Sequence, residues 1–266
     1  MNWSPTASSD WSTAKLNPWR RTEMGDILDL GSGTVHVWRI ELDVPALIRA
    51  RLWTVLTEDE RRRALRFHFA ADTERFVVAH AALRLILARY LGGADPAALC
   101  FSTGAFGKPA LAGAPQFNLS HSDALALCAV ARTRVGVDVE RIRPDFATDD
   151  IASSHFSRHE YAALRAVPPA QRSAAFFACW ARKEAYIKAR GEGLSLALDT
   201  FDVSLSPGET AAIVGTRPDP AEARRWSLSS LDVGRSYAAA VVLEGELACL
   251  GCWQWVPNLE DTRQKR

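Results

Sequence analysis

The chain has 266 residues, of which 48% are hydrophobic and 24% are charged, and its 32 basic and 31 acidic residues leave a net charge of +1. This composition is typical of a soluble globular protein with one large domain or two small ones, and the lack of a basic excess argues against a general nucleic-acid binder. No apolar run approaches the roughly 18 residues of a membrane span, and the N-terminal stretch MNWSPTASSDWSTAKLNPWRR has no apolar signal region, so we expect a cytoplasmic protein that does not enter a membrane.

The first half of the chain begins with an irregular arm at residues 1–30, which is followed by a strand and a long helical region. The segment GTVHVWRIELD alternates in the manner of a strand, with Val35 and Val37 on one face and Trp38 on the other. A helical region is expected over about residues 56–91, and two glycines end it. Short strands and turns come next.

The second half repeats this order of elements. LTEDE and HFSRHE each carry a capping box, a Thr or Ser with Glu three residues later, and in each half a longer helix ending at glycine follows. The sequence therefore predicts an α+β fold made of two similar halves, residues 31–133 and 134–256, related by a pseudo-twofold axis and followed by a tail at 257–266. Because any mixed domain repeats strands and helices, a domain without duplication is the alternative. If the halves pack together, the cleft between them is the expected active site.

Two carboxylates lie on one face of the strand in RVGVDVERIRP, because strand side chains alternate and Asp138 and Glu140 are two residues apart. Adjacent like charges are costly unless a cation lies between them. In the later helix AAFFACWARKEAYIKARGEGL, Glu184 and Lys188 share one face at positions i and i+4. The three carboxylates together would suit Mg²⁺, which accepts carboxylate, water and phosphate oxygens. An exposed Glu–Lys helix pair without a metal is the alternative interpretation.

Two turns add groups that can contact a phosphate. In FNLSHSD, Ser120, His121 and Ser122 offer two hydroxyls and an imidazole. In GKP, Lys108 stands before Pro109, which fixes the direction of the chain. An ordinary turn histidine and an ordinary surface turn are the alternatives, but the combination of these motifs in this order favours a phosphate-bearing substrate.

Five cysteines are scattered along the chain, an odd number that fits reduced thiols. Cys249 and Cys252 form a C-x-x-C pair, but the sequence after them supplies no second pair and no histidine for a zinc site. We expect the pair to serve as small apolar side chains in a terminal strand.

Taken in order, GKP, FNLSHS, GVDVE and WARKEAYIKARGEGL resemble the 4'-phosphopantetheinyl transferases, and best the surfactin-synthetase-activating class, in which a single chain holds two similar halves. The resemblance runs from about Val35 to Val242, and its paired signature, G-x-D-x-E followed by W-x-x-K-E-A-x-x-K, is specific. It implies a holo-[carrier protein] synthase that moves the phosphopantetheine arm of coenzyme A onto a serine of an acyl, peptidyl or aryl carrier protein and releases adenosine 3',5'-bisphosphate. The expected partners are thus coenzyme A and the carrier protein, with no nucleic acid and no membrane, and the expected state is a monomer.

By this resemblance the acidic residues serve the metal and the proton transfer. Asp138 and Glu184 bind Mg²⁺, with Mn²⁺ as an alternative, and Glu140 is a third ligand or acts through a water. Glu184 or Glu140 is the candidate base for the carrier serine, and Lys188 holds the coenzyme A pyrophosphate during catalysis. Lys183, the other lysine of the motif, is expected to be structural.

The resemblance also implies contacts with the rest of coenzyme A. His121 and Ser120 meet the 3'-phosphate and the pyrophosphate region, and Lys108, with Pro109 beside it, lies along the phosphates and the adenine.

In ERRRALRFHFAADTERF, Arg63 and Arg75 match the basic residues that reach the 3'-phosphate in the family. Glu60 stands where the family usually has a basic residue, and this departure bears on 3'-phosphate binding rather than on the reaction. A basic and apolar rim beside the cleft is expected to meet the carrier protein, with RRRALR as one candidate and solvated helix charges as the alternative.

Two other functions compete with this interpretation. A non-catalytic carrier-protein binding module of the same fold would be expected to have lost some of the three carboxylates or Lys188, and all four residues are present. Another Mg²⁺-dependent phosphotransferase or nucleotidase has little support, because the sequence contains neither a P-loop nor the protein-kinase signature set.

Overall fold

The computed structural model describes residues 19–21, 28–104, 106–144, 146, 148–206 and 208–257. The predicted arm at residues 1–30 and the tail at 257–266 therefore lie mostly outside the described residues. No helix in the described ranges is long and apolar enough to cross a bilayer.

Both halves of the chain contain helices followed by short strands. The elements of the first half are β2 (Thr34–Glu41), α1 (Ala46–Val55), α2 (Glu58–Ala64), α3 (Ala70–Tyr90), the 3-10 helix η1 (Pro96–Ala98), β3 (Phe101–Thr103), β4 (Pro109–Leu111), β5 (Gln116–Ser122) and β6 (Leu125–Ala131). Those of the second half are β7 (Val135–Arg141), α4 (Thr148–His155), α5 (Arg158–Ala166), α6 (Pro169–Arg190), the 3-10 helices η2 (Gly193–Ser195) and η3 (Leu198–Thr200), β8 (Phe201–Val203), β9 (Ile213–Thr216), the 3-10 helix η4 (Glu222–Arg225), β10 (Trp226–Ser230) and β11 (Tyr237–Glu244). Two further strands are β1 (Arg20–Arg21) and β12 (Cys249–Gln254).

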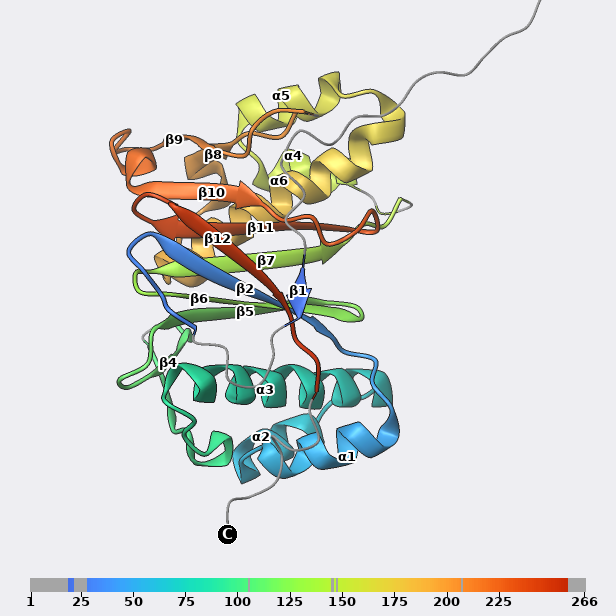
Figure 1. Cartoon of the computed structure of the whole chain (residues 1–266). Helices are drawn as coiled ribbons and strands as arrows, with labels where there is room; N and C mark the ends of the chain where they lie inside the picture. The colour runs from blue at the N-terminus through green and yellow to red at the C-terminus, as the bar shows by residue number, and fades with distance from the viewer. Residues whose placement is uncertain are drawn as a thin grey trace, which may run out of the picture.

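The two larger sheets lie in the middle of the molecule, with α1, α2 and α3 on one side and α4, α5 and α6 on the other (Figure 1). One core packs α3 against the sheet β1-β12-β2-β6-β5, and a second packs α6 against the sheet β10-β11-β7. A third core of valines, leucines and alanines lies between the sheets. The alternation predicted for β2 is confirmed, because Val35 and Val37 belong to the core between the sheets and Trp38 to the core under α3.

The order and pairing of the elements recur in the two halves. In the first half β2 pairs with β6 and β6 with β5, and in the second β7 pairs with β11 and β11 with β10, all antiparallel. In each half the first strand of the trio precedes three helices and the other two follow them. The α+β fold class is confirmed, while the origin of the two halves by duplication stays a prediction.

The terminal segments tie the halves together. Strand β12 lies within the range 134–256 that was predicted as the second half, yet it pairs in parallel with β2 of the first. Strand β1 pairs in parallel with β12, and the indole of Trp19 just before it donates a hydrogen bond to the Asp232 carbonyl oxygen at 2.7 Å. The two cysteines of the C-x-x-C pair lie in β12, as expected, with Cys252 buried and Cys249 exposed.

The helical region of the first half begins earlier and is interrupted more often than predicted. Helix α1 already begins at Ala46, and the chain leaves the helical conformation twice between Val55 and Ala70. Thr57 explains the first interruption, because it is extended (φ −69°, ψ 163°) and caps a new helix, α2. The predicted capping boxes at Thr57 and Ser157 are both confirmed.

The glutamate of each capping box also forms a buried ion pair with the long helix that follows. Glu60 lies 2.8 Å from Arg84 of α3, and Glu160 lies 2.7 Å from Lys183 of α6. In both halves the cation also donates a hydrogen bond to a backbone carbonyl close to the next strand. Glu60 is thus occupied within the fold, which explains why an acidic residue stands at this position of the helix.

The Glu60→Gln variant should be less stable than the unaltered protein at neutral pH, and this difference should shrink in acid. Burial opposes the ionisation of Glu60, but hydrogen bonds from His80, Arg84 and Thr57 outweigh it and lower the pKa of Glu60 to about 2. Because the folded pKa lies below the unfolded one, the charge stabilises the fold above about pH 4.5, and this contribution is lost as the pH falls toward 2. We expect a loss of about 1–3 kcal/mol at pH 7. Urea unfolding of both proteins at pH 7, 4 and 3 measures it, and a difference independent of pH would contradict the assignment.

Candidate active site between the two halves

A glycine lets helix α6 lie directly on strand β7. A Cβ atom built on Gly136 would lie 2.1 Å from the Ala185 carbonyl oxygen and 2.3 Å from the Ala189 amide nitrogen, so a side chain here would push the helix away. Glu184 and Lys188 immediately precede these two alanines in the helix. The glycine of the G-x-D-x-E motif therefore sets the short distance at which these two residues meet the acidic face of β7.

Asp138 is the centre of the site. It is 2% exposed, and its Oδ1 accepts hydrogen bonds from the Ser120 hydroxyl at 2.8 Å and from the Lys188 ammonium at 2.5 Å. Its Oδ2 is also buried and has no hydrogen-bond partner among the described residues. Burial raises the pKa of Asp138 although Lys188 and Ser120 act to lower it. The Lys188 ammonium and the Ser120 hydroxyl thus satisfy the buried Oδ1, whereas Oδ2 has no hydrogen bond among the described residues.

The other two carboxylates, Glu140 and Glu184, are close enough to Asp138 for its charge to raise their pKa values. The Ser122 hydroxyl donates to Oε2 of Glu140 at 3.0 Å. Burial raises the pKa of Glu140, and the charge of Asp138 raises it further. Burial and the charge of Asp138 likewise raise the pKa of Glu184, against the effect of Lys188. Three half-buried or buried acids that disfavour one another's ionisation form a place where a cation would be stabilising.

Strand β5 meets the site through every second residue. Asn118, Ser120 and Ser122 share one face of the strand, and Asn118 Oδ1 accepts a hydrogen bond from the backbone amide of Val137 at 2.8 Å. The Ser122 hydroxyl accepts one from the backbone amide of Arg141 at 3.0 Å. The sequence predicts phosphate contacts for the serines of β5 and no role for Asn118. The signal for Asn118 is that three polar residues stand at alternate positions of this strand, which indicates that one of its faces meets polar groups.

His121 lies on the opposite face of β5 and opens into a cavity of about 240 Å³. The cavity is lined by Phe67, Asp72, Arg75, Phe76, His121, Ser122 and Asp123. Burial lowers the pKa of His121, and the nearby His80 and Lys188 lower it further. The imidazole is therefore neutral at pH 7 without a ligand, and an anion beside it would favour its protonation.

The two arginines predicted to reach a phosphate differ in their surroundings. Arg75 pairs with Asp43 at 3.0 Å and with Asp123 at 2.6 Å. The Arg63 guanidinium is exposed and lies over the Phe76 ring, 5.3 Å from its centroid. A phosphate would thus compete with two carboxylates for Arg75, whereas Arg63 contacts Phe76 of the cavity lining without lining the cavity itself.

Lys108 lies at the junction of the halves rather than at an open cavity. Its ammonium donates to the backbone carbonyl oxygens of Val135 at 2.9 Å and of Lys188 at 2.8 Å. Pro109 is exposed and begins β4, where it pairs with Thr103. The predicted contacts of Lys108 and Pro109 with coenzyme A stay predictions.

The described residues contain no group of three or more His, Cys, Asp or Glu side chains arranged to hold a metal ion. The Lys188 ammonium lies against Asp138 instead. The donor set nevertheless fits a hard cation, because Asp138 Oδ2 is buried without a partner in the described part of the chain and the pKa values of Glu140 and Glu184 are raised. Lys188 would then be free to turn toward a phosphate.

A buried aspartate with two half-buried glutamates, a lysine paired with that aspartate and a histidine beside a cavity define a class of site, one whose groups suit a phosphate-bearing substrate and a hard cation. The sequence profile of the 4'-phosphopantetheinyl transferase superfamily matches residues 134–242, which include β7 and α6. The 4'-phosphopantetheinyl transferase HetI of Nostoc sp. is 39% identical over 224 residues, covering 82% of this chain and 91% of its own.

Two further relatives are 4'-phosphopantetheinyl transferases. The 4'-phosphopantetheinyl transferase Sfp of Bacillus subtilis is 32% identical over 58% of this chain and 69% of its own, and a second B. subtilis 4'-phosphopantetheinyl transferase is 36% identical over the same shares. The holo-[acyl-carrier-protein] synthase of Thermotoga maritima, a solved structure, covers 43% of this chain and 64% of its own with a TM-score of 0.34 and 19% identity, so the fold assignment rests on the strand pairing described above.

The chain belongs to the 4'-phosphopantetheinyl transferase superfamily and is of the Sfp type that its motifs predicted. It is an enzyme that uses coenzyme A and transfers phosphopantetheine to carrier proteins.

Proposed function

We propose that this transfer depends on Mg²⁺ held by Asp138, Glu184 and Glu140, and that it releases adenosine 3',5'-bisphosphate. The observation that carries the proposal is the buried, unpartnered Oδ2 of Asp138 within a group of carboxylates whose pKa values are all raised. A bound cation would satisfy that oxygen and offset the charge of the coenzyme A pyrophosphate. Mn²⁺ has the same preference for oxygen ligands and is the alternative.

In the proposed reaction the hydroxyl of a carrier serine attacks the β-phosphorus of coenzyme A and adenosine bisphosphate leaves. Glu184 or Glu140 takes the serine proton, since each is a half-buried carboxylate beside Asp138. Lys188 moves from Asp138 to the pyrophosphate, where its ammonium stabilises the charge that builds up on the leaving group. The Ser120 hydroxyl, already 3.0 Å from that ammonium, stays beside it in the pyrophosphate region.

The adenosine end of coenzyme A is proposed to reach the cavity beside His121. Arg75, which lines this cavity, and Arg63, which lies over its Phe76, would bind the 3'-phosphate, with Arg63 as the more available of the two because Arg75 is shared between two aspartates. Acyl, peptidyl and aryl carrier proteins are all candidate acceptors. The cytoplasmic location, the monomeric state and the absence of nucleic-acid and membrane partners stay predictions.

The proposal is tested by incubating the protein with coenzyme A and a panel of apo carrier proteins and measuring the intact mass of each carrier. With Mg²⁺ present we expect the mass increment of phosphopantetheine on at least one carrier and adenosine 3',5'-bisphosphate in the supernatant. Chelation of the metal should stop both products, and renewed Mg²⁺ should restore them. Transfer at an unchanged rate in excess chelator would contradict the proposed dependence on Mg²⁺. If no carrier were modified, the result would favour a non-catalytic binding module.

The His121→Ala variant should mainly raise the KM for coenzyme A. A neutral His121 becomes charged when an anion lies beside it, so its removal weakens ground-state binding of the phosphate without altering the reacting groups. We expect a rise in KM of about 10-fold and a change in kcat of less than about 3-fold, as for the loss of one charge-assisted hydrogen bond. Initial-rate kinetics over a range of coenzyme A concentrations measure both constants. A fall in kcat with an unchanged KM would instead place His121 among the reacting groups.

A further inference from the structure

We propose that Lys108 is a positioning residue that fixes β7 and α6 relative to each other, and that it does not bind a phosphate of coenzyme A. The proposal rests on the proposed function, since it concerns how the acidic strand and the lysine-bearing helix of that site are held. Lys108 belongs to the turn between β3 and β4 of the first half, while both of its hydrogen-bond partners belong to the second.

The two carbonyl groups that Lys108 binds are each close to a residue of the site. Val135 is the first residue of β7, three positions before Asp138. Lys188 lies in the last turn of α6, where helix carbonyls lack intrahelical partners and favour a cation. One ammonium thus caps the end of α6 and holds the start of β7 at the same time.

Side chains of the first half replace a neighbouring strand along the free edge of β7. Among the described strands, β7 pairs only with β11. Side chains of the first half bind the backbone carbonyl of Val135 and the backbone amides of Val137 and Arg141. These backbone groups point to one edge of β7 because the three residues are separated by even numbers of positions. Lys108 binds the first of them and Asn118 the second. Lys108 therefore makes the first of a row of side-chain hydrogen bonds that join the first half to the edge of β7. These bonds hold the Lys108 side chain in place in the absence of substrate.

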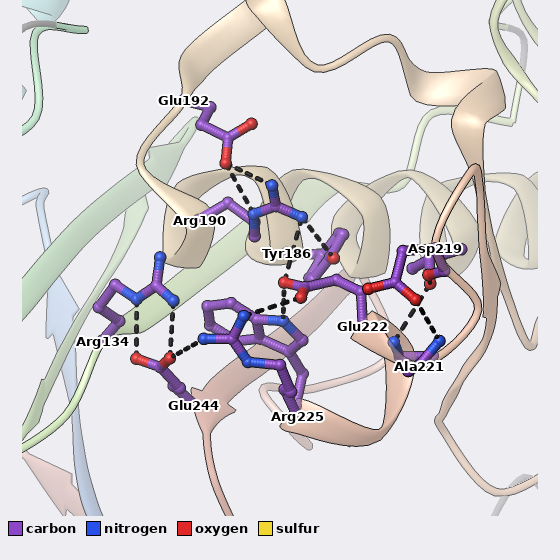
Figure 2. Close-up of polar contacts among 12 residues, drawn as sticks. Arg134, Tyr186, Arg190, Glu192, Asp219, Ala221, Glu222, Arg225 and Glu244 are labelled. Carbon is purple, nitrogen blue, oxygen red and sulfur yellow. Dashed lines mark hydrogen bonds and ion pairs between the residues drawn. The ribbon is translucent and has the colours of Figure 1, made fainter.

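An ion-pair network also joins the same two segments (Figure 2). It joins the start of β7 to the end of α6 through alternating charges, and its members are Arg134, Glu244, Arg225, Glu222, Arg190 and Glu192. Arg134 immediately precedes Val135, and Arg190 follows Lys188 by two residues. Since this network does not involve Lys108, the two elements should stay folded when Lys108 is replaced, and only their fine adjustment should be lost.

The surroundings of Lys108 are less suited to a phosphate ligand. Burial and, to a lesser extent, the charge of Arg134 lower the pKa of Lys108 to about 8. Its methylene stem packs beside Gly191, 3.6 Å from the position that a Cβ atom would take there. To bind a phosphate, Lys108 would have to abandon two buried carbonyl groups, each of which would lose its charged donor.

The test compares coenzyme A with 3'-dephospho-coenzyme A as substrates of the Lys108→Met variant and of the unaltered enzyme. We expect the variant to lose about 10-fold in kcat with both substrates, because a small displacement of Asp138 against Lys188 misplaces the reacting groups. The ratio of the two kcat/KM values should be the same in both enzymes. The Lys108→Arg variant keeps a charged donor and should recover most of the rate, while Ser102→Ala in the same hairpin is the control for a change that leaves α6 untouched.

Three results would overturn the proposal. If Lys108→Met weakens coenzyme A alone and removes the discrimination between the two substrates, Lys108 binds the 3'-phosphate. An equal rise in both KM values with unchanged kcat would place it on the pyrophosphate, and unchanged kinetics would show that it positions nothing. If Lys108→Met does not fold, Lys108→Gln, which keeps an uncharged donor, is measured with the same two substrates and the same criteria. Failure of the proposed function is separate, because the unaltered enzyme would then modify no carrier with either substrate.

Discussion

The Asp138→Asn variant should lose transfer by at least about 1,000-fold, which corresponds to about 4 kcal/mol of transition-state stabilisation. The amide removes the negative charge from the one carboxylate of the group that is fully buried, so the cation loses its central ligand. It also removes the negative charge that pairs with the Lys188 ammonium. Single-turnover measurements with saturating coenzyme A, Mg²⁺ and apo carrier protein quantify the loss.

The fold of this variant should remain intact, which separates loss of chemistry from loss of structure. Burial raises the pKa of Asp138, so ionising it in the folded protein costs free energy that a neutral amide does not. We therefore expect an unfolding temperature at neutral pH in the absence of Mg²⁺ that equals or exceeds that of the unaltered protein. Asp59→Asn, at an exposed residue of α2, is the control for removing a carboxylate elsewhere. Full activity of Asp138→Asn in Mg²⁺ buffer would disprove the assignment of this residue.

Those parts of the site that follow from local periodicity were predictable from the sequence. The alternation in β7 placed Asp138 and Glu140 on one face, and the i, i+4 spacing placed Glu184 with Lys188 on α6. Both capping boxes were visible as Thr or Ser with Glu three residues later. These features depend on a few neighbouring residues, whose physical preferences act before the chain is folded.

Features that depend on distant parts of the chain could not be obtained in this way. The parallel pairing of β12 with β2 joins residues more than 200 positions apart, and nothing in CLGCWQ specifies its partner. Asn118 and Lys108 are polar residues in a strand and a turn, and only the tertiary structure reveals that each binds the backbone of β7. The sequence likewise shows the glycine of the G-x-D-x-E motif but not why a glycine is needed there. In the structure, a Cβ atom on Gly136 would lie 2.1 Å from the backbone carbonyl oxygen of Ala185 in α6.

The buried pair of Glu160 and Lys183 shows how a motif residue can serve the fold rather than the reaction. Lys183 adjoins Glu184 in sequence, but its ammonium points away from the site to Glu160 at 2.7 Å and to the Phe201 carbonyl oxygen at 2.6 Å. Both members of the pair are fully buried. Lys183 also lies over the Phe201 ring, 4.1 Å from its centroid. The structural role expected for this lysine agrees with these contacts.

The Lys183→Met variant should destabilise the protein by about 3–5 kcal/mol, because it leaves the charge of Glu160 buried without a counter-ion. The double variant Glu160→Gln with Lys183→Met should recover part of this loss, since the remaining side chain is neutral. The recovery should be incomplete, because the backbone amides of Ser157 and Val203 donate to different oxygens of Glu160 and the single amide oxygen of glutamine can accept from one of them. Denaturant unfolding at pH 7 measures both free energies.

Arg225→Met provides the matched control for this experiment. Arg225 pairs with Glu222 and Glu244 at 2.9 Å but is 55% exposed, so its removal should cost less than about 1 kcal/mol. A loss at Lys183→Met no larger than that of Arg225→Met would disprove the buried pair as a major source of stability. Measured well below its unfolding temperature, Lys183→Met should keep its KM for coenzyme A, because the lysine contacts the core of the second half rather than Asp138 and Lys188 of the proposed site.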